Sequence, residues 1–215
     1  MAGGDRQDDK RPCAKSGACN THILRDADGA EMKIYLIRHG RTEANEKRLY
    51  CGSTDLPLSK SGVELIKKCA IKYPKAQDYY TSGMLRADQT LKLLYGEIPF
   101  MSVSELKEMN FGDFEMRAYE ELKNDPHYQE WIAGDNFQKA CPNGESGAQM
   151  ALRVLTAFEE IARKGRDAVI VTHGGVIAAI MQEMFPNEGK NRYEWQPKPG
   201  GGYIVDIAKK HYSVI

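Results

Sequence analysis

The side chains of this sequence that could do chemistry begin with one arginine–histidine pair. Arg38 and His39 follow the apolar residues 34–37 and precede Gly40. A buried strand that ends in this way passes its next side chains to a loop at its carboxyl end, where open α/β sheets bind their ligands. A neutral imidazole can attack a phosphorus atom while a guanidinium holds the phosphate oxygens. The pair therefore predicts phosphoryl chemistry with His39 as the nucleophile.

A second strand end carries the same pattern. Residues 168–172, rich in β-branched aliphatic side chains, predict a strand that runs into His173 and Gly174. In a parallel sheet both strand ends open on one edge, so the imidazoles of His39 and His173 are expected to meet there. A third predicted strand, residues 79–81, ends close to Arg86, which lies one turn into the following helix.

A carboxylic acid is also expected, because a leaving alkoxide needs a proton as its bond to phosphorus breaks. Glu105, Glu108 and Glu115 all lie in the segment that could supply it, and their spacing alone does not distinguish them. Cys51 lies close to the predicted pocket. A thiol nucleophile there would leave the two His-Gly strand ends without a purpose, so we favour His39.

Alternating strands and helices must position these side chains. This pattern predicts an α/β fold of three layers: a doubly wound, mostly parallel sheet with helices on both faces and a small helical cap over the active site. The cap is expected as an insertion at about residues 96–145, which contain several turn signals. Ser59 or Ser61 is expected to cap the first helix. The predicted strands are residues 33–37, 78–81, 168–172 and, as the last one, 203–207; the predicted helices are residues 63–70, 85–95, 145–164 and 176–185.

The composition excludes several classes of protein. The chain has 215 residues, with thirty basic and thirty acidic side chains and a formal net charge of zero, so no overall basic field favours nucleic acid. No long apolar run predicts a membrane span, and the absence of a secretory signal predicts a cytoplasmic protein. The five scattered cysteines predict neither a disulfide framework nor a zinc site. Residues 1–31 have the polar composition of a disordered extension, and residues 32–215 are expected to form the folded domain.

The motifs, in this order, resemble those of the histidine phosphatase superfamily, which also contains the cofactor-dependent phosphoglycerate mutases. The resemblance covers residues 32 to about 207, and residues 36–45, 81–90 and 171–175 carry it most strongly. It implies that His39 forms a phosphohistidine and that Glu108 is the general acid, since residues 106–112 match the family's pattern there. No metal ion or other cofactor is expected, because arginines already supply the positive charge. The residues that the resemblance places at the phosphate are Arg38, Asn45, Cys51, Gly52, Arg86, His173 and Gly174.

Hydrolysis is the expected reaction. The folded part is compact, the segment around Glu108 resembles the phosphatase branch, and residues 126–131 and 142–146 resemble the α-ribazole phosphatases of cobalamin synthesis. One departure is Met116, where many of these phosphatases have glycine. The expected function is therefore a metal-independent phosphomonoesterase for a small phosphorylated metabolite, with α-ribazole 5'-phosphate as one substrate. A phosphoglycerate mutase, a non-catalytic phospho-ligand-binding module and a metal-dependent hydrolase are the alternatives, and the oligomeric state stays open.

Overall fold

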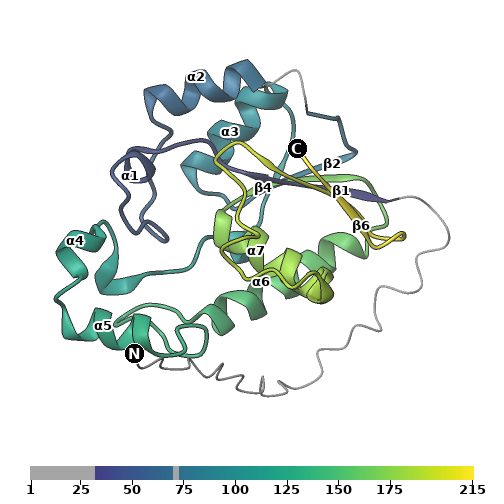
Figure 1. Cartoon of the computed structure of the whole chain (residues 1–215). Helices are drawn as coiled ribbons and strands as arrows, with labels where there is room; N and C mark the ends of the chain where they lie inside the picture. The colour runs from purple at the N-terminus through teal and green to yellow at the C-terminus, as the bar shows by residue number, and fades with distance from the viewer. Residues whose placement is uncertain (1–31, 70–72) are drawn as a thin grey trace, which may run out of the picture.

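The computed structural model describes residues 32–69 and 73–215 (Figure 1). The extension expected at residues 1–31 lies outside the described residues. The strands are β1 (Lys33–Arg38), β2 (Asp78–Thr81), β3 (Met101–Ser102), β4 (Ala168–Thr172), β5 (Gly202–Asp206) and β6 (His211–Val214). The helices are α1 (Glu43–Glu46), α2 (Lys60–Cys69), α3 (Leu85–Tyr95), α4 (Tyr119–Leu122), α5 (Pro126–Ala133), α6 (Gly147–Ala162) and α7 (Gly174–Met184), with short 3-10 helices η3 (Ser104–Leu106), η4 (Gly112–Phe114) and η5 (Pro186–Glu188).

The six strands form one mixed sheet in the order β3-β2-β4-β1-β5-β6. The pairs from β3 to β1 are parallel, and β5 runs antiparallel to both of its neighbours. In the central pair, Arg38 at the end of β1 is in register with Thr172 at the end of β4. The next residue of each strand end is a histidine, so the register brings His39 and His173 to one edge, as predicted.

Helices cover both faces of the sheet, which confirms the predicted three layers (Figure 1). Successive residues of β1 point to opposite faces: Tyr35 and Ile37 pack in a cluster with residues of α2 and α3, while Ile34 and Leu36 pack in a cluster with residues of α6 and α7. All five residues of β4 are buried. A strand covered on both faces favours apolar side chains, which explains residues 168–171, and the hydroxyl of the last residue, Thr172, donates to the carbonyl of Leu106 at 2.7 Å.

Local capping explains several helix boundaries. Ser59 caps α2, because its Oγ accepts the N–H of Gly62 at 3.1 Å. Ser146 caps α6 in the same way and forms a reciprocal capping box with Gln149. Helix α7 begins at Gly174, two residues before the predicted start.

Two strands differ from the sequence-based expectation. Strand β5 is not the last strand, since β6 follows it and pairs with it at the edge of the sheet. Strand β3 was not predicted, because it has two exposed residues. The side chains of β6 are mostly exposed as well. Short edge strands without a buried face give no alternation of apolar and polar residues, so their sequences carry no signal.

The cap lies to the left of the sheet in Figure 1 and contains α4 and α5. Its core is aromatic: Tyr50, Phe111, Phe114, Tyr128 and Trp131 pack mostly edge to face, with ring centroids 5.1–6.4 Å apart. Such geometry suits the quadrupoles of aromatic rings. Within residues 32–69 and 73–215, none of the helices combines the length and apolar character that crossing a membrane requires.

Candidate active site

The site is built around two buried imidazoles at the carboxyl ends of β1 and β4. The ring centroids of His39 and His173 lie 5.1 Å apart, and the rings are 61° from coplanar. His39 is 5% exposed and His173 is fully buried. The meeting of the two histidines, predicted from the strand ends, is therefore present in the structure.

Hydrogen bonding fixes the tautomer of His39. Its Nδ1 lies 2.6 Å from the carbonyl oxygen of Gly40, which can only accept, so Nδ1 carries the proton. The lone pair of the neutral ring is then on Nε2. Burial, together with the charges of Arg86 and Arg38, lowers the pKa of His39 to about 3. The imidazole is therefore held as a neutral nucleophile at neutral pH.

Arg86 connects the second imidazole to the loop after α1. It is 1% exposed, and its Nε donates to His173 Nδ1 at 3.3 Å. Its two terminal nitrogens donate to the carbonyls of Thr54 and Gly52 at 2.8 and 2.7 Å. Each terminal nitrogen keeps a second N–H, and its contact with a phosphate oxygen stays a prediction.

The protonation state of His173 follows from these contacts. Because Nδ1 accepts from Arg86, Nε2 carries the proton of the neutral ring and donates to Ser82 Oγ at 2.8 Å. Burial, followed by the nearby His39 and Arg86, lowers the pKa of His173 well below its ordinary value. Both ring nitrogens thus have protein partners. A direct contact of His173 with phosphate stays a prediction, and it requires one of these bonds to be exchanged.

Arg38 has donors to spare. Its Nη1 donates to the carbonyl of Pro197 at 2.8 Å, whereas its Nε is buried without a partner among the residues described. Gly174, the first residue of α7, leaves the room that the guanidinium needs, since a Cβ there would lie 3.0 Å from Arg38 Cζ. The predicted position of Gly174 beside the phosphate ligands is therefore explained by close packing.

Glu108 is held by two backbone N–H groups. Its Oε1 accepts from Met109 at 3.0 Å, and its Oε2 accepts from Gly175 at 2.9 Å. A Cβ on Gly175 would clash with Glu108 Oε1. The consecutive glycines after His173 thus make room for the two groups on which the predicted chemistry depends, Arg38 and Glu108.

The other two candidate acids lie in different surroundings. Glu105 is exposed. Burial raises the pKa of Glu115, but hydrogen bonds from the Thr54 hydroxyl and from backbone N–H groups outweigh it, so this pKa lies below its usual value. The groups that donate to the Glu115 carboxylate are the N–H groups of Gly52, Ser53, Thr54 and Phe111 and the hydroxyl of Thr54. Glu115 thus braces the loop that presents two carbonyls to Arg86.

Three further predicted phosphate ligands lie in or beside this loop. Asn45 Oδ1 accepts the N–H of Thr42 at 3.0 Å, and the donation of its amide N–H groups to a phosphate stays a prediction. Cys51 is half-buried, and burial raises the pKa of its thiol. The N–H of Gly52 donates to the Glu115 carboxylate, and its contact with a phosphate stays a prediction.

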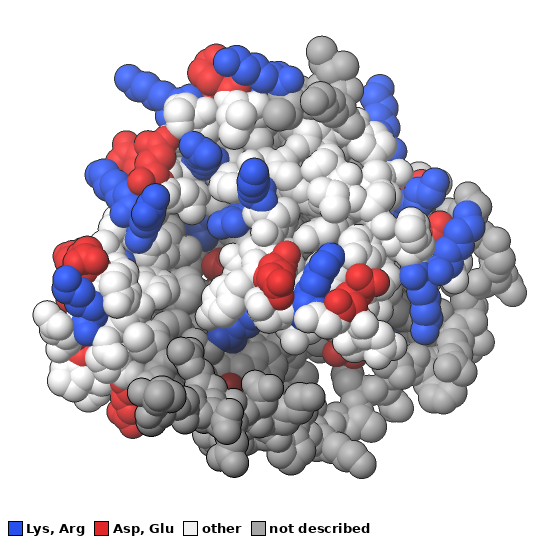
Figure 2. All heavy atoms as spheres, in the orientation of Figure 1, with Lys and Arg blue, Asp and Glu red and all other residues white. Residues whose placement is uncertain are grey.

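A cavity of about 410 Å³ opens between the cap and α7. Figure 2 shows the hollow from outside, with basic and acidic side chains within it. His39, Arg86 and His173 are buried and are not among the residues that line this cavity; His39 directly follows the lining residue Arg38 in the chain. The residues that line the cavity at the predicted phosphate site are Arg38, Asn45, Cys51, Glu108 and Gly175. The rest of its wall includes Tyr50, Phe111, Trp131, Asn136, Phe137, Gln182, Arg192, Tyr193 and Gln196.

Sequence reasoning missed several of these residues. Ser82 directly follows β2, so the strand-end argument that found His39 could have found it. Residues 191–197 supply the carbonyl bonded to Arg38 and part of the cavity wall, but they contain no motif. Their place in the site depends on tertiary packing, which the sequence pattern does not reveal.

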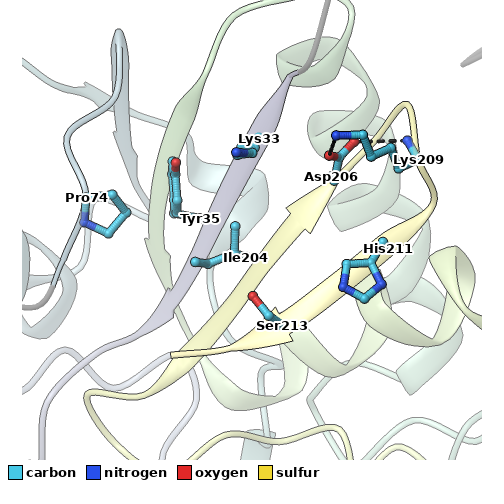
Figure 3. A pocket seen from close by; sticks show the side chains of 8 residues that line it. All are labelled: Lys33, Tyr35, Pro74, Ile204, Asp206, Lys209, His211 and Ser213. Atoms are coloured by element: carbon cyan, nitrogen blue, oxygen red, sulfur yellow. Dashed lines mark hydrogen bonds and ion pairs between the residues drawn. The ribbon is translucent and has the colours of Figure 1, made fainter.

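A second cavity, of about 350 Å³, lies beside the start of β1 and the end of β5, away from the two histidines (Figure 3). Lys33, Tyr35, Ile204 and Asp206 line it, and Asp206 is paired with Lys209 through the backbone N–H and the ammonium group. It shares no residue with the first cavity. In the part of the chain that the structure describes, no three histidine, cysteine or acidic side chains converge in a way that could hold a metal ion.

Comparisons with known proteins agree with this geometry. The model of the histidine phosphatase superfamily (branch 1) matches residues 34–215. The adenosylcobalamin/alpha-ribazole phosphatase of Salmonella typhimurium is 28% identical over 191 residues, 83% of this chain and 92% of that protein. The metal-independent phosphoserine phosphatase of Arabidopsis thaliana is 30% identical over 159 residues, 69% of this chain and 66% of that protein. The crystal structure of the alpha-ribazole phosphatase from Shigella flexneri superposes with a TM-score of 0.75 at 27% identity, covering 86% of this chain and 95% of that one. The chain is therefore a phosphatase that belongs to branch 1 of the histidine phosphatase superfamily.

Proposed function

We propose that the protein hydrolyses the phosphomonoester of a small metabolite in two steps through His39, with α-ribazole 5'-phosphate as the first substrate to test. The observation that carries this proposal is the state of His39. The imidazole is buried and neutral, two guanidinium groups act on it, and its Nε2 lone pair has no partner among the described residues. Such a ring can act as a nucleophile without first losing a proton.

In the first step, His39 Nε2 attacks the phosphorus atom. The bond between phosphorus and the ester oxygen breaks, and Glu108 transfers its proton to the leaving oxygen. Arg38 and Arg86 stabilise the negative charge that is spread over the remaining phosphoryl oxygens. Their fixed positions matter because donors that are already oriented need no reorganisation during the reaction.

In the second step, water attacks the phosphorus atom of the phosphohistidine. Glu108, now ionised, accepts a proton from this water, and the electron pair of the phosphorus–nitrogen bond returns to Nε2. The site is then restored with inorganic phosphate bound. The open cavity beside Glu108 supports this step, because water can enter it once the alcohol has left.

The size and lining of the cavity support a bulky alcohol. Aromatic rings from Tyr50, Phe111 and Trp131 form part of its wall. A three-carbon phosphoglycerate would leave most of about 410 Å³ unfilled, which favours hydrolysis of a larger ester over the mutase reaction. The curated relative from Salmonella typhimurium is named for adenosylcobalamin and α-ribazole, whose phosphates are larger esters of this kind.

The test is phosphate release from p-nitrophenyl phosphate and α-ribazole 5'-phosphate in the presence of EDTA. We expect turnover by the wild type and a loss of at least a thousandfold in His39→Ala, roughly the contribution of a nucleophile to catalysis. His211→Ala removes an exposed histidine of β6 and serves as the matched control. Alkaline quenching during turnover should trap the phosphohistidine on the wild type only.

Three results would contradict the proposal. Turnover that survives His39→Ala would show that His39 is not the nucleophile. Interconversion of 2- and 3-phosphoglycerate faster than phosphate release would identify a mutase instead. Chelator sensitivity of the wild type would point to a metal-dependent hydrolase.

A further inference from the structure

The wall of the active-site cavity contains a second cation that the two-step mechanism does not use. Arg192 lines the cavity, and its guanidinium donates to Asn136 Oδ1 and, at 3.2 Å, to the hydroxyl of Tyr193. Its Cζ lies 5.1 Å from the centroid of the Tyr193 ring. These three residues, Asn136, Arg192 and Tyr193, are called the Arg192 cluster below.

The charge of Arg192 is not neutralised by the protein. No carboxylate lies within ion-pair distance of it among residues 32–69 and 73–215. Glu108 is the single acidic residue among those that line the cavity. Gly147, the first residue of α6, packs against Arg192, since a Cβ there would lie 3.3 Å from Nη1. The amino end of a helix carries a partial positive charge, so α6 adds no compensation.

A buried donor without a partner lies in the same wall. Trp131 is 6% exposed, and its Nε1–H is buried without an acceptor in the described part of the chain. Leaving a buried N–H unpaired is unfavourable, so an acceptor atom supplied by a ligand would stabilise the site. The rings of Tyr50, Phe111 and Phe137 line the cavity beside it and offer flat apolar surface.

The cavity is also long. It follows α7 from Gly175, which contacts Glu108, to Gln182 two turns later. Seven residues of helix span about 10 Å, so the cavity extends well beyond a phosphate held near Glu108. A leaving group of two fused rings has about this length.

We propose that the alcohol part of the substrate carries a planar aromatic ring and, beyond it, an oxygen acceptor, and that Arg192 binds this acceptor. The aromatic wall contacts the faces of the ring, and the Arg192 cluster selects substrates by the oxygen that they present. This proposal rests on the proposed phosphatase function and adds the chemical class of its leaving group. Arg192 acts here in specificity, and the reacting atoms are left to His39 and Glu108.

The test compares two substrates that differ in one group: naphthyl phosphate, and a naphthyl phosphate with a carboxylate on the far ring. Their ratio of kcat/KM, carboxylated over plain, is measured for wild type, Arg192→Gln and Arg192→Lys. A charge-assisted hydrogen bond predicts a ratio at least about tenfold lower in Arg192→Gln, with partial recovery in Arg192→Lys. Arg163→Gln, which changes an exposed arginine of a surface ion pair, is the matched control and should keep the wild-type ratio.

The outcomes separate the two proposals. An equal ratio in wild type and Arg192→Gln, with both substrates hydrolysed, would overturn the Arg192 subsite and leave the phosphatase function standing. A plain naphthyl phosphate turned over no faster than glycerol phosphate by the wild type would overturn the aromatic part of the proposal. Turnover of none of these esters would overturn the phosphatase function and the subsite together.

Discussion

Holding His39 neutral should make the protein less stable in acid, and this can be measured without any substrate. Burial lowers the pKa of His39 to about 3 in the folded state, whereas a histidine in an unfolded chain has a pKa near 6.5. Between these two values the unfolded state binds a proton that the folded state does not. The free energy of unfolding therefore falls as the pH decreases from about 6.5 towards 3. Above about pH 6.5, His39 is neutral in both states and does not make stability depend on pH.

The two pKa values set the size of the effect. Between pH 7 and pH 5, a shift of this size removes about 2 kcal/mol of the free energy of unfolding. His39→Gln replaces the imidazole by a side chain that never titrates in this range. The wild type should therefore lose about 2 kcal/mol more than His39→Gln over the same interval, whatever the other titrating groups contribute in common.

Urea unfolding at pH 7 and pH 5, followed by circular dichroism, gives the four free energies that this comparison needs. His211→Gln is the control, because His211 is exposed on β6 and its variant should lose as much stability as the wild type. Equal losses in the wild type and His39→Gln would refute the reasoning. They would mean that His39 accepts a proton in the folded state, and that the nucleophile is not held ready by burial.

Three further substitutions test the backbone and the polar contacts of the site. Met116 has a positive φ of 59°, so Met116→Gly should raise the free energy of unfolding by about 1 kcal/mol in urea titrations, whereas Met116→Ala should not. Gly175→Ala should displace Glu108 and lower kcat about a hundredfold for alkyl phosphates. The loss should be smaller for p-nitrophenyl phosphate, because its leaving group needs less protonation. Equal losses for both esters would contradict the role of Glu108 as the acid. Ser82→Ala should leave the buried His173 Nε2–H unpaired and lower stability by about 1–3 kcal/mol, and an unchanged urea midpoint would rule out that hydrogen bond.

Met116 lies where many similar phosphatases have glycine. Its φ is positive, and this is the backbone conformation that glycine adopts most easily. The Met116 N–H donates to the carbonyl of Tyr50 at 2.7 Å, which holds the left-handed turn in place. The turn thus forms although a methionine side chain disfavours a positive φ.

The sequence predicted those parts of the site that lie at the ends of buried strands. Strands β1 and β4 are continuous apolar runs, and the polar residues that follow such runs are easy to recognise. His39 and His173 were found in this way, and their meeting at one edge of the sheet followed from parallel pairing. The general acid was different, since Glu105, Glu108 and Glu115 are separated by their surroundings and not by their spacing.

The far wall of the cavity could not be predicted, and this has a consequence for function. Phe137 and Arg192 belong to irregular segments more than fifty residues apart; both lie against Gly147 at the start of α6, and Arg192 donates a hydrogen bond to Asn136. Neither segment has a period or a motif from which a contact could be inferred. The proposed nucleophile thus lies at the end of a regular strand, since His39 directly follows β1, whereas Phe137 and Arg192 of the proposed alcohol site belong to loops. Loops accept substitutions more readily than buried strands, so one reaction centre can be combined with different leaving-group sites. For this reason the reaction class can be inferred from the strand ends, while the substrate has to be inferred from the cavity wall around Arg192.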